Sequence, residues 1–254
     1  MGVPTQLATL ERYYDTVPRA TAATEEVGPF TLFVARSGWP YYARPTLGTD
    51  ASFTADDVRA VLDRQRKLGV PRHLEWVQEV TPSLLPAATE AGLPVAECAL
   101  MVLADDIVEH RLDGVSVRML EPGDDGFGQT RAAVDAGFNE RDALTVEPVA
   151  DVIAAHVGQG WMRVAGAFDS DANAVGGGSH SPRGDVTEVT GIAVIPAWRR
   201  RGIGAVLAAR LAHDAHELGV TTVFLSAASE SVARVYARVG FVRVGTACIA
   251  EDHE

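Results

Sequence analysis

The sequence has no long apolar run, no secretion signal and only two cysteines. No apolar stretch approaches the roughly 18 residues that a membrane span needs. The first residues, MGVPTQLATLERYYD, do not show the basic-then-apolar order of a secretion signal. Cys98 and Cys248 lie far apart without metal-type spacing, which predicts two small core residues in a reducing compartment. We therefore expect a cytoplasmic protein with no membrane partner.

Positive charge is also scarce. The chain has 22 lysines and arginines against 34 aspartates and glutamates, a net charge of −12. This balance argues against nucleic-acid binding and against anionic membrane surfaces, and it mildly favours cationic small partners. The 254 residues, 47% of them apolar and 22% charged, suffice for one large globular domain or two modest ones.

The hydrophobic pattern alternates between strand and helix periods, which predicts an α/β fold of mixed type. The polar segment 104–114 predicts a boundary between an N-terminal α/β domain (1–112) and a second domain (113–254). Expected strands cover 30–35, 41–45, 74–80, 95–103, 115–120, 161–168, 173–180, 186–194, 222–227 and 241–251. Expected helices cover 54–69, with Thr54 as N-cap, and 82–92, 124–138, 147–158, 203–219 and 230–240.

Two parts of the chain look like imperfect copies of each other. Residues 68-LGV-70 and 218-LGV-220 each lead through a strand and a helix to a glycine and an apolar strand. The second glycine follows the first by 23 positions in the first copy and by 21 in the second. Chance similarity is the alternative explanation. If the repeat is real, the first copy serves as a scaffold or substrate wall without a phosphate site.

Only the second copy carries 199-RRRGIG-204, and it places three arginines where a helix is predicted to begin. Cations at a helix N-terminus cost stability because that end carries a partial positive charge. Glycines allow a tight turn and a close approach to free N–H groups, which makes an anion site. A bound pyrophosphate would offset the repulsion; the alternative is a glycine-rich turn with solvated arginines. The dinucleotide-binding fingerprint and the Walker motif are excluded, because Leu207 replaces the third glycine and no Gly-Lys-Ser/Thr follows.

The segment resembles the GNAT family of acyl-CoA N-acyltransferases. The resemblance rests on strand 187-TEVTGIAV-194, Pro196, Arg199-x-x-Gly202-x-Gly204 and the closing Tyr236…Gly240-Phe241, and it spans roughly residues 115–254. It implies a GNAT fold: a mixed, largely antiparallel twisted sheet flanked by helices. A smaller domain, which is itself GNAT-like in a degenerate form, would precede it.

The resemblance also implies acetyl-CoA as co-substrate and no metal. The loop amides would hold the CoA pyrophosphate, at Arg199, Arg200, Arg201, Gly202, Ile203, Gly204 and Ala205. The preceding strand end would pair with the pantetheine arm, at Ile192, Ala193 and Val194. The family often has asparagine seven residues before the tyrosine, and Ser229 stands there, so this cofactor contact is weakened or replaced.

Acyl transfer needs a neutral amine, which costs about 4–5 kcal/mol at pH 7 for an amine of pKa about 10.4. Glu188, four residues before Ile192, matches the offset of the catalytic glutamate in histone-acetylating relatives and is our candidate base. An ordinary strand carboxylate is the alternative. Tyr236 occupies the family's position for the acid that protonates the CoA thiolate, with a core tyrosine as the alternative. A backbone N–H near Val194 would help the oxyanion.

Three other groups are weaker candidates. His213 and His216 fit a solvated helix face far better than a metal site. Residues 176–178 with His180 fit either an acceptor groove or a flexible hairpin. The segment 38-GWPYYARP-45 fits buried packing better than a substrate pocket.

The leading hypothesis is an N-acetyltransferase that moves an acetyl group from acetyl-CoA to a primary amine by direct attack. The alternatives are a non-catalytic CoA-binding sensor or regulatory module, and a structural protein with an empty fold. A small-molecule amine and a protein amine are both acceptable acceptors. The oligomeric state is open, with a homodimer among the options.

Overall fold

The computed structural model describes residues 5–36, 41–104, 106–147 and 151–252, and the chain forms two compact units. Unit 1 comprises Met1–Leu100, Ser226–Ser229 and Val244–Glu254, and unit 2 comprises Met101–Leu225 and Glu230–Arg243. The C-terminal segment therefore returns to the first unit. The expected domain division at 112/113 stays a prediction, because compactness alone does not show which segments fold independently.

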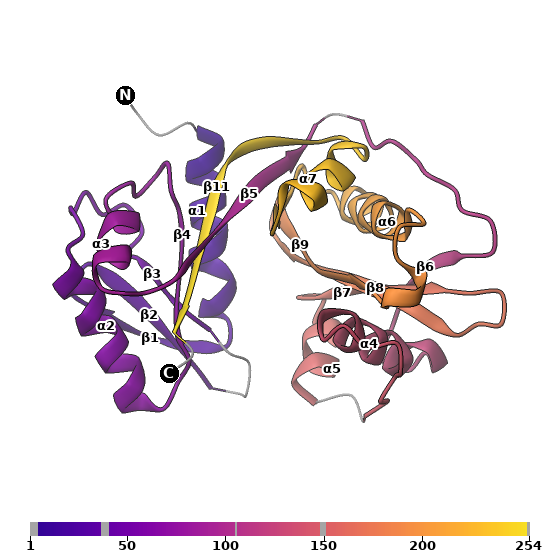
Figure 1. Cartoon of the computed structure of the whole chain (residues 1–254), viewed down its shortest axis with the longest axis horizontal. Helices are drawn as coiled ribbons and strands as arrows, with labels where there is room; N and C mark the ends of the chain where they lie inside the picture. The colour runs from indigo at the N-terminus through magenta and orange to yellow at the C-terminus, as the bar shows by residue number, and fades with distance from the viewer. Residues whose placement is uncertain (1–4, 37–40, 105, 148–150, 253–254) are drawn as a thin grey trace. The chain divides into compact units, whose positions relative to one another are not determined.

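Unit 1 is a sheet with helices packed on it (Figure 1). Its strands hydrogen-bond in the order β1-β2-β3-β4-β11, in which β11 (Phe241–Asp252) is the last strand of the chain. The core is built from apolar residues of β2, α2 and β4, among them Phe30, Leu32, Val58, Leu74 and Trp76. The elements in chain order are α1 (Thr5–Arg19), β1 (Ala22–Val27), β2 (Phe30–Ala35), β3 (Ala43–Pro45), α2 (Ala55–Leu68), β4 (Arg72–Val77), α3 (Leu84–Glu90) and β5 (Val95–Leu103).

Helix α2 begins and ends as the sequence predicts. Thr54 is the N-cap: its hydroxyl accepts from the Asp57 amide, and the Asp57 carboxylate accepts from the Thr54 amide at 2.9 Å. Gly69 closes the helix in the left-handed conformation, with φ of +67°. The first turn of α2 is thus satisfied by the protein's own side chains.

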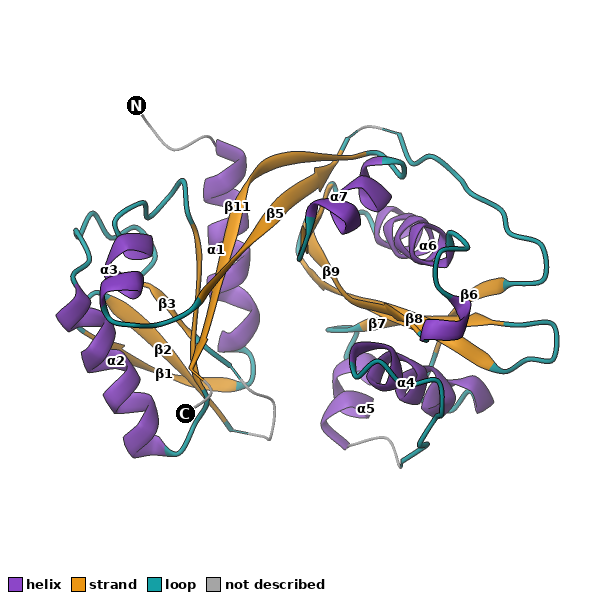
Figure 2. Cartoon of the chain, viewed as in Figure 1, coloured by secondary structure: helices purple, strands orange, loops and turns teal. Residues whose placement is uncertain are grey.

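Unit 2 contains a sheet in the order β10-β9-β8-β7-β6. Strands β6 to β9 of this sheet are labelled in Figure 2. Helix α6 covers one face of this sheet, and α4 and α5 cover the other (Figure 1). The elements that follow β5 are β6 (Ser116–Leu120), α4 (Asp125–Phe138), α5 (Asp151–Gly158), β7 (Arg163–Phe168), β8 (Ala174–Arg183), β9 (Val186–Val194), a short 3₁₀ turn (Pro196–Trp198), α6 (Ile203–Glu217), β10 (Thr222–Ala227) and α7 (Glu230–Ala237).

The glycines of β8 let helices pack closely on both faces of the sheet. A Cβ at Gly177 would collide with Thr130 of α4, and a Cβ at Gly178 would lie only 2.7 Å from Ile192 Cγ1, on the α6 face. Residues 176–178 therefore serve close packing. His180 is fully buried, so the expectation that it lines an open acceptor groove is wrong.

The two units share a pattern of strand pairing. Each has one parallel pair among its described pairings, β3–β4 in unit 1 and β9–β10 in unit 2, and each pair is joined by a helix, α2 or α6. The last strand, β11, begins in unit 2 and pairs antiparallel with β4 of unit 1, from Ala247↔Val77 to Asp252↔Arg72. This common order supports the internal repeat inferred from the sequence.

The predicted elements are present, with ends shifted by a few residues, and β2, β5, β9 and β10 have the expected bounds. Helix α1 and strand β1 were not predicted. The start of the 147–158 helix prediction and the 38–40 part of the predicted aromatic packing lie outside the described residues. Among the described helices, none has the length and apolarity to cross a membrane.

Candidate functional site

Strands β9 and β10 run parallel and then separate. Their three ladder pairs end at Phe224↔Glu188, while β9 continues to Val194. Along 189–194, β8 pairs with one edge of β9, and the described residues provide no paired strand on the other edge. Because backbone N–H and C=O groups need partners, this open edge can pair with an extended ligand.

A β-bulge lies within this open segment. The register of β9 against β8 shifts between Gly177 and Ser179, and Gly191 adopts a φ of +64°. The extra residue reverses the side-chain alternation of the strand. Ile192 therefore points to the α6 face and contacts the start of that helix, near Gly204.

Glu188 lies where the two strands begin to separate. The side chain of the preceding residue, Thr187, bonds to His180 on the α6 face. Because side chains alternate along a strand, Glu188 points to the opposite face, which α4 and α5 cover. It is half-buried and opposite Ser181 of β8. Glu188 therefore places a carboxylate at the point where β9 and β10 separate.

Arg199 attaches the loop that follows β9 to its surroundings. Its Nε donates to the Val194 carbonyl oxygen at 3.0 Å, and its Nη2 donates to the Gly137 carbonyl oxygen at 2.7 Å. Its Nη1 pairs with Glu140 at 2.6 Å, which raises the pKa of the Arg199 guanidinium and lowers that of the Glu140 carboxyl. The Arg199 side chain is thus engaged by protein groups, and the loop is anchored to the end of α4.

The residues after Arg199 leave their amides open. Arg200 and Gly202 have φ values of +63° and +89°, and such left-handed conformations turn successive N–H groups toward one side. Within the described part of the chain, the backbone N–H groups of 200–204 have no acceptor, and Gly202 provides no side-chain cap for α6. Open amides at a helix N-terminus are the arrangement that suits an anion.

The three arginines have different roles. Arg201 stacks over the ring of Trp198 at 4.5 Å and donates to the Ala197 carbonyl oxygen at 3.2 Å. The exposed guanidinium of Arg200 has no partner among the described residues. Only Arg200 is therefore fully available to a phosphate through its side chain.

Gly204 is not required by the fold. Its φ is not positive, and a Cβ there would lie 3.9 Å from Ile192 Cγ2, an ordinary van der Waals distance. Neither the backbone nor the packing therefore demands glycine here. The space before the first turn of α6 is open to a ligand that approaches the main chain.

Tyr236 is buried on α7, with 8% of its surface exposed, and its ring packs edge-on against Phe241 at 6.2 Å. Burial raises the pKa of its phenol to about 12. The described residues supply no hydrogen-bond partner for its hydroxyl. The hydroxyl therefore keeps its proton at neutral pH and is available as a donor.

A buried polar network lies under α6, beside the point where β9 and β10 separate. The sequence did not reveal this network. His180 bonds through Nδ1 to Thr187 (3.0 Å) and through Nε2 to Asp214 (2.9 Å). Arg163 donates two bonds of 3.0 Å to the same carboxylate. Burial by itself would raise the pKa of Asp214, but the hydrogen bonds from His180 and Arg163 outweigh it and hold the pKa well below its usual value. The network fixes β9 to α6 one residue before Glu188.

The structure places the other predicted residues as follows. Ala193 lies against α4 beside Gly137, and Ile203 and Ala205 are buried in the first turn of α6. Ser229 precedes α7 among the residues of unit 1, and its contact with a cofactor stays a prediction. His213 faces Glu109 at 3.6 Å.

The open strand edge, the uncapped helix start and the anchored loop follow one another in a strand–loop–helix arrangement. Residues 141–241 match the sequence model of the Acetyltransferase (GNAT) family. These residues are a GNAT acetyltransferase domain. No curated protein matches the chain.

Solved structures agree with this assignment. A GCN5-related N-acetyltransferase from Kribbella flavida is 19% identical with a TM-score of 0.75, covering 100% of this chain and 97% of that one. A second, from Sphaerobacter thermophilus, is 18% identical with a TM-score of 0.63, covering 90% and 82%. A tandem GNAT protein from the clavulanic acid biosynthesis pathway is 18% identical with a TM-score of 0.51, covering 87% and 78%. At these identities the likeness shows the GNAT fold, and the tandem protein is consistent with a GNAT-like N-terminal copy.

Proposed function

We propose that the protein transfers an acetyl group from acetyl-CoA to a primary amine. The observation that carries this proposal is the combination of a β9 edge left open after Glu188 and an uncapped, glycine-lined start of α6 directly after that strand, within a GNAT domain. Acetyl-CoA has an extended amide-bearing arm joined to a pyrophosphate. Its chemical shape matches an open strand edge followed by an anion site.

The residues present fit the CoA group. The five open amides of 200–204 would hold the pyrophosphate, with the exposed guanidinium of Arg200 adding charge. The open β9 edge, which includes 192–194, would pair with the pantetheine arm. Gly204 leaves space at the helix start, which Ile192 bounds. Bound acetyl-CoA supplies the thioester carbonyl that the amine attacks.

Glu188 would accept the proton of the amine as the new bond forms, directly or through water. Its position, where the pairing of β9 with β10 ends, puts a carboxylate beside the strand edge where the thioester would lie. A backbone N–H near Val194, beyond the Gly191 bulge of β9, would polarise the carbonyl.

Tyr236 would donate its hydrogen bond to the departing sulfur. A phenol with a pKa of about 12 stays protonated throughout the neutral range. The same high pKa makes complete proton transfer to a thiolate of pKa about 8.5 unfavourable, so we infer stabilisation by a strong hydrogen bond before solvent delivers the proton.

The test is CoA-thiol release from acetyl-CoA in the presence of amines: spermidine, kanamycin and a lysine peptide. The proposal predicts release that depends on one of these amines and is lost in Gly204→Glu. Gly204→Ala, which the structure accommodates, is the matched control and should retain most of the activity.

The alternative is a CoA-binding sensor without catalysis. The observation that favours it is Ser229, which replaces the asparagine of many family members. A protein that binds acetyl-CoA with micromolar affinity, yet releases no thiol with amines of every class above, would support the sensor.

A further inference from the structure

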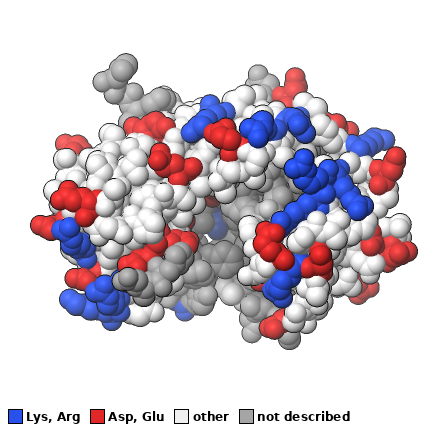
Figure 3. Space-filling model, in the orientation of Figure 1, with Lys and Arg blue, Asp and Glu red and all other residues white. Residues whose placement is uncertain are grey.

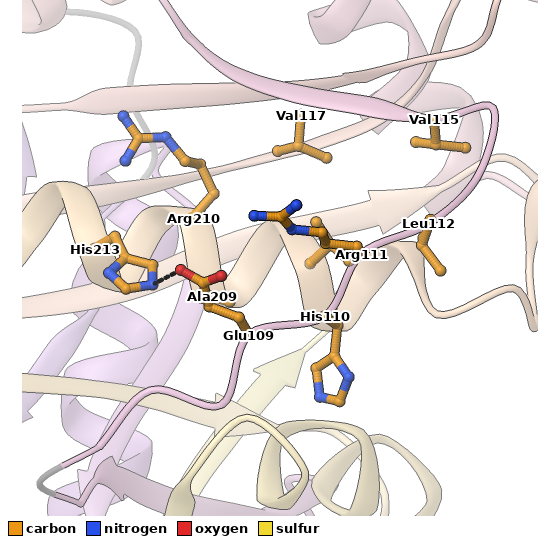
Figure 4. Close-up of a pocket in the computed structure, with 10 residues that line it drawn as sticks. Glu109, His110, Arg111, Leu112, Val115, Val117, Ala209, Arg210 and His213 are labelled. Atoms are coloured by element: carbon orange, nitrogen blue, oxygen red, sulfur yellow. Dashed lines mark ion pairs between the residues drawn. The ribbon is translucent and has the colours of Figure 1, made fainter.

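A second pocket, of about 330 Å³, lies in unit 2 on the outer side of α6. Segment 109–112 crosses the helix there, and the start of β6 forms the far wall (Figure 4). The apolar part of the lining consists of Leu112, Val115, Val117, Val206 and Ala209. This volume is at the lower end of the range of small-molecule sites, about 300–1,000 Å³.

Two arginines provide the charge of this pocket. Arg111 extends from the crossing segment toward Arg210 of α6 (Figure 4). Arg111 has no ion-pair partner among the described residues, and Arg210 is 3.6 Å from an exposed carboxylate, Glu217. At that distance and exposure the Arg210–Glu217 ion pair contributes little free energy, so both guanidinium groups remain available to a ligand.

The other polar residues of the pocket are one carboxylate and two histidines. Glu109 faces His213 at 3.6 Å, and the dashed line in Figure 4 marks this pair. His110 turns away from Arg111 and bonds to the Arg238 carbonyl oxygen at 3.2 Å. The lining thus has two arginines against one carboxylate, which leaves an excess of positive charge. Figure 3 shows basic side chains gathered over α6 on this face of an otherwise acidic protein.

We propose that this pocket binds a small organic carboxylate with an apolar body. Guanidinium groups bind carboxylates through paired, charge-assisted hydrogen bonds, which Arg111 and Arg210 would supply. The valine-lined wall would cover the hydrocarbon part of the ligand. An inorganic anion would leave that wall in contact with water, and an amine would meet the two arginines.

The pocket is separate from the proposed acyl-transfer site, although α6 serves both. It lies along Val206 to His213, one to three turns into the helix, whereas the open amides end at Gly204. Leu112 nevertheless connects the two, because a Cβ at Gly202 would lie 3.4 Å from its Cδ2. A ligand in the pocket therefore contacts the segment that rests on Gly202, in the middle of the 200–204 loop.

The test uses phenylacetate and its neutral counterpart phenylacetamide as probes, with binding to the full chain followed by NMR titration. We expect phenylacetate to bind, and the amide to bind at least about tenfold more weakly. Arg111→Gln and Arg210→Gln should each weaken phenylacetate binding by about tenfold. Arg12→Gln, which removes the same charge from an exposed position on α1, should not. Thermal unfolding of each variant confirms that it is folded.

A second variant, Val206→Phe, should block the pocket without changing its charge. Equal binding of acid and amide, unchanged binding in the arginine variants, or no phenylacetate binding at millimolar concentration would each overturn the proposal. Displacement of phenylacetate by acetyl-CoA would also overturn it, because the pocket would then belong to the cofactor site. These outcomes do not depend on whether the protein transfers acetyl groups.

Discussion

The Arg199 guanidinium donates a 3.0 Å hydrogen bond back to the carbonyl oxygen of Val194, five residues before it in the chain. This contact joins the end of β9 to the loop that precedes α6. The same guanidinium also forms an ion pair with the Glu140 carboxylate and donates to the Gly137 carbonyl oxygen at the end of α4. The arginine thus anchors the loop, whereas its neighbour Arg200 has no partner among the residues that the structure describes.

This difference predicts different behaviour for neighbouring arginines. Arg199→Gln should lower the free energy of unfolding by about 1–3 kcal/mol, because two backbone carbonyls lose a charged donor. Arg200→Gln should stay within about 0.5 kcal/mol of the wild type, since its side chain has no partner in the described chain. Urea unfolding measures both. Equal stabilities for the two variants would contradict the anchoring role.

Glu188→Gln should change the pH dependence of the reaction. Without the carboxylate, catalysis depends on amine that is already neutral, so the rate should fall most at low and neutral pH and recover toward pH 10. The measurement is kcat/KM against pH for the wild type, the variant and the exposed control Glu97→Gln. A variant profile parallel to that of the wild type would remove Glu188 from the mechanism.

Tyr236→Phe should lower kcat while leaving the affinity for acetyl-CoA nearly intact. The two rings have the same shape, and only the hydroxyl is lost. A second effect concerns stability: because burial raises the phenol pKa from 10.0 to about 12, the native state favours the protonated form. That contribution is complete below pH 10 and is lost as the pH rises toward 12. Wild-type stability should therefore decline more steeply over this window than that of the phenylalanine variant. Full turnover in Tyr236→Phe would refute the catalytic role.

Asp214→Asn should destabilise the protein by about 3–5 kcal/mol at pH 7, because Arg163 and His180 lose their shared carboxylate under α6. The pKa of Asp214 is lower in the native state than in the unfolded state, so ionisation of this carboxyl stabilises the native state. Its contribution is present above the unfolded pKa of about 3.9 and is lost as the pH falls further. Wild-type stability should thus fall more steeply than that of the variant between pH 5 and pH 2, in urea titrations. Glu121→Gln, which removes an exposed partner of Arg163, is the mild control.

Local signals explain what the sequence could predict. Thr54, Asp57 and Gly69 set the ends of α2 through contacts within the helix itself, and the arginine–glycine loop lies between a clear strand and a clear helix. The contrast between the two helix starts was also predictable in part. The first turn of α2 is capped by Thr54 and carries acidic residues, whereas that of α6 has Gly202 and no cap.

Contacts between distant segments explain the features that the sequence could not predict. Arg199 is followed by glycines that point to a ligand, yet its partners Glu140 and Gly137 lie about sixty residues away in the chain. His180 joins residues of β9 and α6 that no spacing rule connects. The bulge at Gly191 did leave a signal, an isolated glycine within an apolar strand, and this signal predicts irregular pairing.

The most direct test of the account is calorimetric titration with acetyl-CoA of the wild type and of Gly204→Glu, Gly204→Gln and Gly204→Ala. A carboxylate in the first turn of α6 favours the helix dipole, so Gly204→Glu should fold at least as well as Gly204→Gln. The account predicts micromolar binding to the wild type and to Gly204→Ala, weaker binding to Gly204→Gln and none to Gly204→Glu. Acetyl-CoA at a hundredfold excess over Kd should also stabilise the wild type by about 2.7 kcal/mol. Undiminished binding to a folded Gly204→Glu, or none to the wild type, would contradict an acetyl-CoA site at the start of α6.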